Sequence, residues 1–179
     1  MKKPDGHILE TERTILRELT TDDAQFNLDL LNQPSFIKYI GDRGVRTIEQ
    51  SIDFIESRYR KSYAENGFGL NLVEIKPAGG DKTLTPIGIC GFVKRDTLPD
   101  VDIGFAFLPD FEKKGYAFET ADAMMKFGKE ELGLTRVLAI TTRDNKSSQS
   151  LLKKLGFEYE KNVKMSGDDE ELFLFSTDL

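Results

Sequence analysis

The sequence predicts one α/β domain built on a mixed, mainly antiparallel sheet that is flanked by helices. The chain has 179 residues, which is the length of one ordinary domain. Strand-like segments alternate with helical ones, and turn-rich sequence joins pairs of strand-like segments before the long helix and near the C-terminal end. We therefore expect residues 1–179 to form a single domain.

The first third of the chain predicts a strand followed by two helices. Residues 14–19 alternate apolar and polar side chains, as an opening strand does. Asp22 and Asp23 mark the start of a first helix, because acidic residues favour the N-terminal turn. A second helix is expected over residues 47–64, where apolar side chains keep near-helical spacing until the Asn-Gly pair at 66–67 ends it.

The middle of the chain predicts a sheet followed by a long helix. Residues 68–75 and 84–94 have the pattern of two strands, and the turn-rich segment 77–81 joins them. Residues 101–108 predict a third strand, which prolines bound at both ends. The helix is expected over residues 116–132, with an apolar stripe along one face.

The C-terminal part predicts four more elements around a turn at 166–168. In the order strand, helix, strand and strand they cover residues 136–142, 147–155, 157–164 and 171–177. Asp144 or Asn145 is expected to cap the short helix, since both residue types accept hydrogen bonds from the first helical N–H groups.

Composition excludes several functional classes. Apolar residues make up 39% and charged residues 31%, as in a soluble globular protein. The single cysteine, Cys90, excludes an intrachain disulfide and a multi-cysteine zinc site, and it is expected to be a small core residue. The single histidine, His7, lies in a polar N-terminal run that we expect to fray, which argues against a histidine-dependent triad or metal centre. We therefore expect no metal.

The charge and hydropathy patterns bear on partners and location. The formal net charge of −6 argues against non-specific binding to nucleic acid. Residues 136–164 nevertheless hold seven basic and three acidic side chains, which suits either a small polyanion or a solvated face. No apolar run approaches the ~20 residues that span a membrane, and the first ten residues lack a signal-peptide core. These patterns predict a cytoplasmic protein with no membrane contact.

The strand at 101–108 places small side chains next to one another on one of its faces. That face carries Asp102, Gly104, Ala106 and Leu108. Gly104 and Ala106 together leave a slot, which either a closely packed helix or a narrow ligand lying along the strand could fill. The residues themselves favour the helix.

The loop at 112–117 precedes the long helix and is a candidate anion site. A tight loop before a helix directs several N–H groups toward one point, where the helix dipole also favours anions. Gly115 allows close approach to the backbone, and Lys113 and Lys114 add positive charge. Lysines before a helix are also common on protein surfaces that bind no ligand, so the loop could instead be an ordinary surface loop. The loop matches neither a Walker motif nor a dinucleotide-binding glycine motif.

Three segments, taken in order, resemble one known family. They are LETERTILREL at the start, IGFAFLPDFEKKGYAFET across the third strand and the loop, and DNKSSQSLLKKLGF near the end. Together they resemble the GNAT superfamily of acyl-CoA-dependent N-acyltransferases, and especially its RimJ/RimL branch. The resemblance covers nearly the whole chain. It implies the GNAT fold and acetyl-CoA as cosubstrate.

The resemblance also implies where acetyl-CoA binds. Its diphosphate is expected on the backbone amides of Lys113, Lys114, Gly115, Tyr116 and Ala117. The pantetheine arm is expected along Phe107 and Leu108, with Asn145 holding it from the other side. The slot, the loop and the basic segment would then serve one ligand.

The implied reaction moves an acetyl group from acetyl-CoA to a primary amine by direct attack. The acceptor could be a protein N-terminal α-amine or a small-molecule amine. An alkyl amine with a pKa near ~10 must lose a proton before it attacks, and Asp102 on the slot face is the candidate base. Ser148 is the candidate proton donor to the departing thiolate, and a backbone N–H near Phe107 is the candidate donor to the acyl oxygen.

Several alternatives remain open from the residues. Ser148 could instead bond to the helix backbone, and Asp102 could be an ordinary exposed strand residue. Tyr39, Arg46 and Tyr116 could line the acceptor pocket. The chain could be a monomer or a homodimer.

Two departures from the family pattern leave the function itself open. Glu112 replaces the usual Gln or Arg at the head of the loop, and Leu152 stands where many members have a catalytic tyrosine. They motivate an alternative function, a non-catalytic CoA-binding or sensing domain. A structural module whose loop binds nothing is a third possibility.

Overall fold

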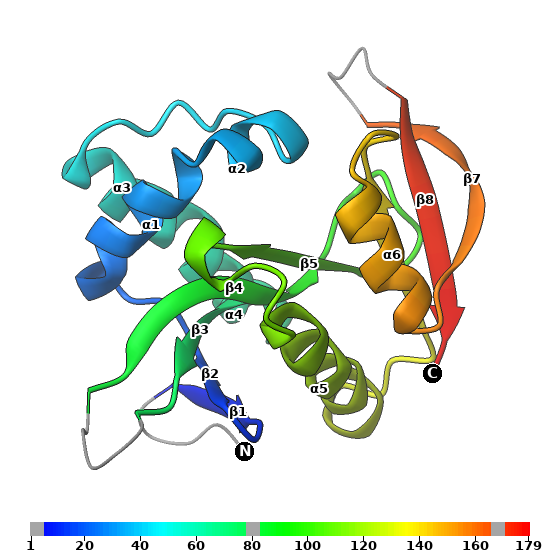
Figure 1. Ribbon diagram of the computed structural model, residues 1–179, viewed down its shortest axis with the longest axis horizontal. Coiled ribbons are helices and arrows are strands. Elements are labelled where there is room, and N and C mark those ends of the chain that lie inside the picture. The colour runs from blue at the N-terminus through cyan, green and yellow to red at the C-terminus, as the bar shows by residue number, and fades with distance from the viewer. Residues whose placement is uncertain (1–5, 78–82, 166–170) are drawn as a thin grey trace.

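The structure is a computed structural model that describes residues 6–77, 83–165 and 171–179. Within these ranges the chain forms an eight-stranded sheet with the spatial order β1-β2-β3-β4-β5-β6-β8-β7 (Figure 1). Neighbouring strands are antiparallel except β5 and β6, which are parallel. This confirms the predicted mixed, mainly antiparallel sheet. The strands are β1 (His7–Glu10), β2 (Thr14–Arg17), β3 (Leu70–Ile75), β4 (Thr85–Val93), β5 (Asp102–Phe107), β6 (Arg136–Thr141), β7 (Glu158–Lys164) and β8 (Glu171–Asp178).

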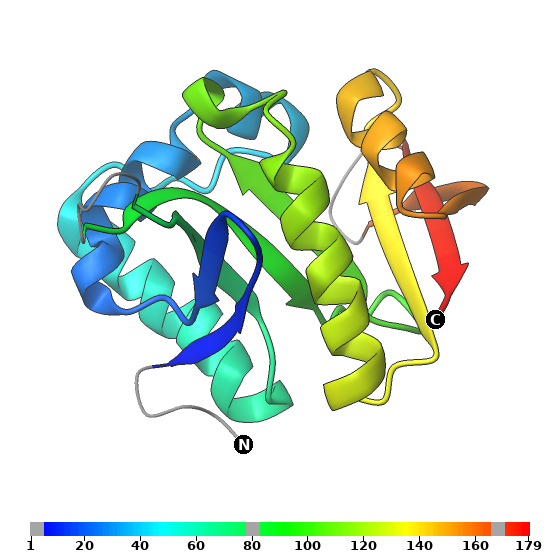
Figure 2. The ribbon, with the colours of Figure 1, turned by 60° about the horizontal axis from the view of Figure 1, so that its bottom comes forward.

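Helices cover both faces of the sheet. α5 and α6 lie on one face, and α1 to α4 lie on the other (Figures 1 and 2). None of the helices in the described ranges is long and apolar enough to cross a membrane. The helical segments are η1 (Thr21–Asp23), α1 (Ala24–Leu31), α2 (Pro34–Tyr39), α3 (Ile48–Phe54), η2 (Ile55–Arg60), α4 (Lys61–Asn66), η3 (Pro109–Phe111), α5 (Tyr116–Glu131) and α6 (Lys146–Lys154).

The sheet divides the hydrophobic core into two parts. On the α5 side, Met124 packs in one cluster with Phe92 and Phe107. On the other side, Leu30 and Tyr59 belong to a second cluster beneath α1 and η2. Each helix layer therefore buries its apolar stripe against its own face of the sheet, which fixes the helix ends that border the candidate site.

The predicted elements of the first third are confirmed, and two more are present. The helix expected at 47–64 is a continuous run from α3 through the π-turn η2 to α4. Thr47 caps its start, where its hydroxyl accepts a hydrogen bond from the Gln50 N–H at 3.3 Å. Gly67 ends it with φ of +77°.

The expectation that His7 lies in a frayed run is wrong, because residues 7–10 form β1 and pair with β2. The short helix α2, which was not expected, begins at Pro34, where a missing N–H costs nothing.

The later predictions are confirmed within one or two residues at each end. Asn145, rather than Asp144, caps α6, since its side-chain oxygen accepts a hydrogen bond from the Ser148 N–H at 3.1 Å. Cys90 is fully buried in the core, as expected. The turn expected at 77–81 lies, from residue 78 on, outside the described residues, and so does the turn at 166–168.

The slot predicted beside Gly104 is filled by a leucine instead of a helix. A Cβ atom on Gly104 would lie 3.1 Å from Cδ2 of Leu70. Leu70 of β3 faces Gly91 of β4, which in turn faces Gly104 of β5. Because Gly91 has no side chain, the leucine reaches across β4 to β5. The room on this face therefore serves packing within the sheet.

A buried ion network fixes the start of α1 to the sheet. Arg17 of β2 donates two hydrogen bonds to Asp23, at 2.8 and 2.9 Å, and two to Glu74 of β3, both at 3.0 Å. The side chains of Asp23 and Glu74 are only 8% and 6% exposed. Burial alone would raise the pKa of Asp23, but the hydrogen bonds from Arg17 and Thr20 outweigh it and lower the pKa.

Arg17→Met is expected to lower the free energy of unfolding by about 3 kcal/mol, because it leaves two buried carboxylates without their partner. Urea denaturation at neutral pH measures the loss. The lowered pKa of Asp23 makes its stabilising effect complete above the ordinary value of 3.8, and that effect is lost as pH falls below it. The difference in the free energy of unfolding between the parent and Arg17→Met should therefore become smaller in acid.

The matched control is Arg60→Met, which removes an exposed arginine from its pair with Glu56. Such surface pairs contribute about 0.5 kcal/mol at most. An equal loss of stability for both variants would contradict the role given to the Arg17 network.

Candidate active site

The candidate site begins where two neighbouring strands separate. β5 and β6 pair only at Asp102 and Leu138, with the Leu138 N–H donating to the carbonyl oxygen of Val101 at 2.9 Å. Beyond that point β5 continues along β4, and the Leu108 N–H donates to the Ile87 carbonyl oxygen at 2.9 Å. Because backbone groups alternate in direction along an antiparallel strand, the N–H of Phe107 faces away from β4 and toward the gap.

The two residues expected to contact the pantetheine arm lie on opposite faces of this strand end. Phe107 is buried in the cluster beneath α5. Leu108 is half-buried in the cluster on the other face. What the two residues share is an open backbone edge. After Asp102, the β6 side of β5 pairs with no other strand in the described part of the chain. The backbone could therefore pair with an extended ligand, as an added strand does.

The loop at 112–117 has an unusual backbone that leads into α5. Lys113 has φ of +58° and Gly115 has φ of +87°, both in the left-handed region. Gly115 stands at the N-cap position of α5, and no side chain caps the helix there. The N–H groups of the first turn, from Tyr116 onward, therefore lack the partner that a capping side chain would supply. The dipole of this 16-residue helix adds partial positive charge at the same place.

This loop fits the diphosphate of a coenzyme A molecule. Uncapped N–H groups need an acceptor, and alternating left-handed residues turn successive N–H groups toward a common point. Lys113 and Lys114 are exposed and cationic, and the Lys114 amino group lies 5.7 Å from the centre of the Phe111 ring. Glu112 is exposed as well, so its carboxylate is not buried against the loop.

The structure shows a reason for glycine at position 115 that the sequence did not indicate. A Cβ atom there would lie 3.2 Å from Nη2 of Arg13. The missing side chain therefore makes room for a guanidinium as well as allowing the left-handed backbone. Arg13 comes from the turn between β1 and β2, more than 100 residues away, and no local pattern in the sequence connects it with the loop.

The start of α6 borders the gap from the other side. Leu152 is buried in the cluster beneath α5, and Ser148, one turn earlier on the same helix face, is half-buried. The hydroxyl of Ser148 has no hydrogen-bond partner among the described residues. The structural alternative, a serine bonded to the helix backbone, is thus not realised. The side-chain oxygen of Asn145 caps the helix, which leaves its amide NH₂ group able to donate to a ligand.

Asp102 lies away from this region. Asp102 is only 1% exposed, and its carboxylate accepts a hydrogen bond from Nε of Arg95 at 2.8 Å. Burial raises its pKa above the ordinary value, although Arg95 counteracts that effect. It sits where β5 and β6 are still paired, ~20 Å along the strand from Leu108. A role as general base stays a prediction, and its surroundings are those of a structural ion pair.

A cavity of about 680 Å³ lies between α1 and the end of β5. Its lining includes two acidic residues, Asp29 and Asp110, together with Leu108. Of the three residues predicted for an acceptor pocket, Arg46 lines the cavity. Tyr39 is in α2, where Lys38 lies over its ring, and Tyr116 stacks beneath Arg13. No group of three or more His, Cys, Asp or Glu in the described ranges could hold a metal ion.

Known proteins resemble this chain over most of its length. A family model described as "Acetyltransferase (GNAT) domain" matches residues 13–158. The protein named uncharacterized N-acetyltransferase YoaA, from Bacillus subtilis (strain 168), is 29% identical over 155 residues, which are 86% of this chain and 84% of that protein.

Solved structures show the same fold. RimL, a ribosomal alpha-N-protein acetyltransferase solved in complex with coenzyme A, has a TM-score of 0.81 and 13% identity, covering 97% of this chain and 98% of that one. The microcin self-immunity acetyltransferase MccE, solved with acetyl-CoA and AMP, has a TM-score of 0.77 and 18% identity, covering 99% and 98%. At these identities the likeness is one of fold alone.

Proposed function

The chain belongs to the GNAT acetyltransferase family and resembles its RimJ/RimL branch, and we propose that it transfers the acetyl group of acetyl-CoA to a primary amine. The observation that carries the proposal is the gap between β5 and β6, which lies between the uncapped start of α5 and the start of α6. We also propose that residues 1–179 act as one catalytic unit.

The proposed cofactor site combines backbone and side-chain donors. The loop amides from Lys113 to Ala117 would hold the diphosphate. The free backbone edge at Phe107 and Leu108 would pair with the pantetheine arm, and the amide of Asn145 would donate to it from α6. All of these groups are donors or open backbone positions, which suits a ligand rich in phosphate and amide oxygens.

Acetyl-CoA supplies the acetyl group as a thioester, which an amine can attack directly. The Phe107 N–H would donate a hydrogen bond to the acyl oxygen, on which negative charge develops. The Ser148 hydroxyl would give its proton to the sulfur as the thiolate leaves, and it would take up the proton that the amine nitrogen loses after its attack, directly or through water. The amine must be neutral when it attacks, so a base must first remove one proton.

The cavity between α1 and β5 supports an amine acceptor. Asp29 and Asp110 bring two carboxylates to a lining that also contains Leu108 at the end of the cofactor strand. The cation in this lining, Arg46, is paired with Asp42, which offsets its charge. Carboxylates attract an alkylammonium ion toward the site before it loses its proton. Both candidate acceptors, a protein N-terminus and a small free amine, carry this group.

Acetyl-CoA is expected to raise the melting temperature by roughly 5–10 °C at a concentration of 100 times its Kd. Desulfo-CoA should do nearly as well, because the diphosphate and the arm are unchanged. NAD and ATP should have little effect, since neither has the pantetheine arm. The shift should shrink with added salt because phosphate contacts are screened. Differential scanning fluorimetry measures it, and no shift at millimolar acetyl-CoA would contradict the proposed function.

Transfer itself is tested by the release of free CoA thiol with a broad panel of amines. An acceptor should give stoichiometric thiol and acetylated amine, which mass spectrometry identifies. Tight binding of acetyl-CoA with no thiol release for any amine would instead favour the non-catalytic CoA-binding domain.

A further inference from the structure

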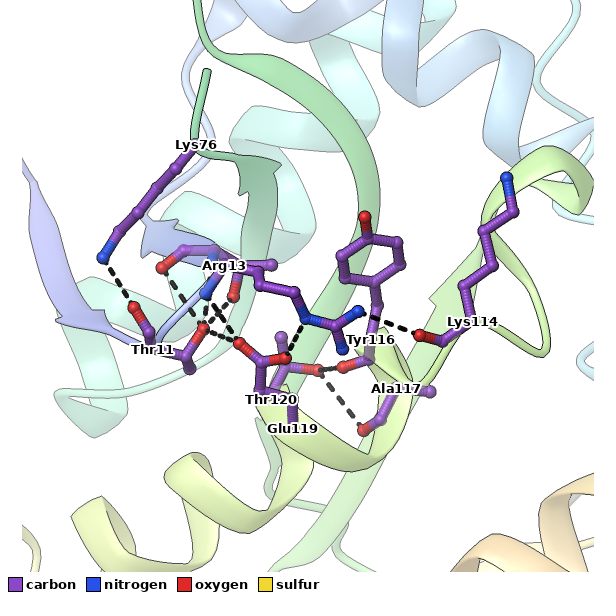
Figure 3. Close-up of polar contacts among 9 residues, drawn as sticks. Thr11, Arg13, Lys76, Lys114, Tyr116, Ala117, Glu119 and Thr120 are labelled. Atoms are coloured by element: carbon purple, nitrogen blue, oxygen red, sulfur yellow. Dashed lines mark hydrogen bonds and ion pairs between the residues drawn. The ribbon is translucent and has the colours of Figure 1, made fainter. Parts of the chain in front are cut away.

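The turn between β1 and β2 holds the first turn of α5 through one carboxylate (Figure 3). Glu119 accepts hydrogen bonds from the Thr11 hydroxyl at 2.5 Å, from the Arg13 backbone N–H at 2.8 Å and from Arg13 Nε at 2.6 Å. Burial alone would raise the pKa of Glu119, but these hydrogen bonds outweigh it and lower the pKa. Glu119 therefore stays ionised at neutral pH and bonded to the turn.

The rest of the Arg13 guanidinium contacts the loop itself. Nη1 donates to the Lys114 carbonyl oxygen at 3.0 Å, and Cζ lies 4.3 Å from the centre of the Tyr116 ring. Nη2 lies where a Cβ atom on Gly115 would be only 3.2 Å away. One side chain thus touches three successive residues of the loop, from the side where the Gly115 side chain would be.

The backbone of Arg13 is itself fixed to the sheet. Its carbonyl oxygen accepts a hydrogen bond from the Lys76 N–H at 2.9 Å, just beyond β3. The Lys76 amino group donates to the Thr11 carbonyl oxygen at 2.5 Å and pairs with Glu10 at 3.1 Å. The guanidinium is therefore presented from a rigid support. The left-handed Lys113 nearby needs such support, because non-glycine residues enter that region only at a cost.

We propose that Arg13 is a positioning residue for the diphosphate of acetyl-CoA. It holds Lys114, Gly115 and Tyr116 in the conformation that turns their N–H groups toward one point, and Glu119 orients it. This inference rests on the proposed function. Arg13 acts through the loop and not on the reacting atoms, because its guanidinium contacts Lys114 and Tyr116 and lies where the Gly115 side chain would be. Figure 3 shows Arg13 beside the start of α5.

Arg13→Gln is expected to raise the Kd for desulfo-CoA about tenfold. That factor corresponds to about 1.4 kcal/mol, close to the value of one hydrogen bond to a charged group. Arg13→Lys keeps the charge but cannot reach Glu119 and the Lys114 carbonyl together, so it should not restore affinity. Isothermal titration calorimetry measures both. Arg60→Gln is the matched control, since Arg60 is similarly exposed at 46% against 41% and also pairs with a glutamate.

A second measurement separates positioning from general stability. With an amine from the panel, Arg13→Gln should raise the KM for acetyl-CoA about tenfold and leave kcat at saturation unchanged. S-acetylpantetheine has the same thioester and arm but no diphosphate. Its kcat/KM should be the same for Arg13→Gln and the parent.

The outcomes of these experiments distinguish a failure of the role given to Arg13 from a failure of the proposed function. If the parent binds desulfo-CoA and both Arg13 variants bind it equally well, the inference is wrong and the proposed function stands. If the variants lose activity with both donors in parallel, Arg13 supports the fold as a whole, which also overturns the inference. If the parent itself binds no desulfo-CoA, the proposed function fails and the inference fails with it.

Discussion

Gly115→Glu is expected to raise the Kd for acetyl-CoA about 100-fold. The new side chain would leave the loop on the side of Arg13, so its carboxylate would compete with Glu119 for the guanidinium that supports the loop. Without that support the loop can leave its left-handed conformation, which a glutamate disfavours by about 1–2 kcal/mol. The added negative charge near the diphosphate costs about 1 kcal/mol more in water, and each 1.4 kcal/mol is a factor of ten. The new Cβ would also meet Arg13 Nη2 at 3.2 Å and displace the guanidinium that supports the loop. Calorimetry with acetyl-CoA measures the loss.

The other end of α5 offers a matched control. Gly133 also has a left-handed backbone, with φ of +66°, and nothing lies within 4 Å of its Cβ position. Gly133→Glu therefore introduces the same residue and a similar backbone strain of ~1–2 kcal/mol, far from the loop. It should melt earlier but bind acetyl-CoA with parental affinity. Near-parental affinity for Gly115→Glu would mean that the diphosphate does not bind at this loop.

The loop and the helices beside it could be predicted because their signals are local. Pro109 ends a strand, Gly115 opens a helix, and the capping residue Asn145 stands directly before α6. Such residues act on the backbone within a few positions, so a single sequence shows them. The candidate cofactor contacts follow from the same stretch through its resemblance to a family.

The parts that could not be predicted depend on contacts between distant segments. Arg13 reaches Lys114 across 101 residues, and the filling of the slot at Gly104 depends on Leu70 passing over a third residue, Gly91. Such contacts depend on the order of strands in the sheet, which spacing along the chain does not give. β1, only four residues long, was missed because its stability comes from pairing with β2 and not from its own pattern.

The role proposed for Asp102 shows that knowing the face of a strand on which a side chain lies is not enough to place it in a site. The alternation of side chains correctly placed it on the same face as Leu108, but position along the strand matters as much as the face. Asp102 lies at the paired end of β5 with Arg95, while the gap opens toward the other end. Asp102 therefore carries less of the proposed chemistry than Ser148, whose helix start borders the gap.

Ser148→Ala is expected to lower kcat by roughly 10²-fold, the lower end of the range for general acid–base catalysis. The hydroxyl has no hydrogen-bond partner among the described residues, so it can donate to the sulfur of the leaving group. Binding of acetyl-CoA should hardly change, because the loop and Asn145 are proposed to hold it. The melting temperature should not fall, since alanine is the better helix former. The measurement is kcat at saturating acetyl-CoA with an amine from the panel.

Ser150 supplies the control for this last experiment, because it is an exposed serine on the same helix, two residues further and therefore on another face. Ser150→Ala should keep parental kcat. Ser148→Cys should retain part of the rate, since a thiol can also donate a proton. A loss shared equally by the two alanine variants would point to the helix and not to the hydroxyl. If Ser148→Ala keeps more than about half of the parental kcat, no step in the reaction depends on this proton, and Ser148 is not the proton donor.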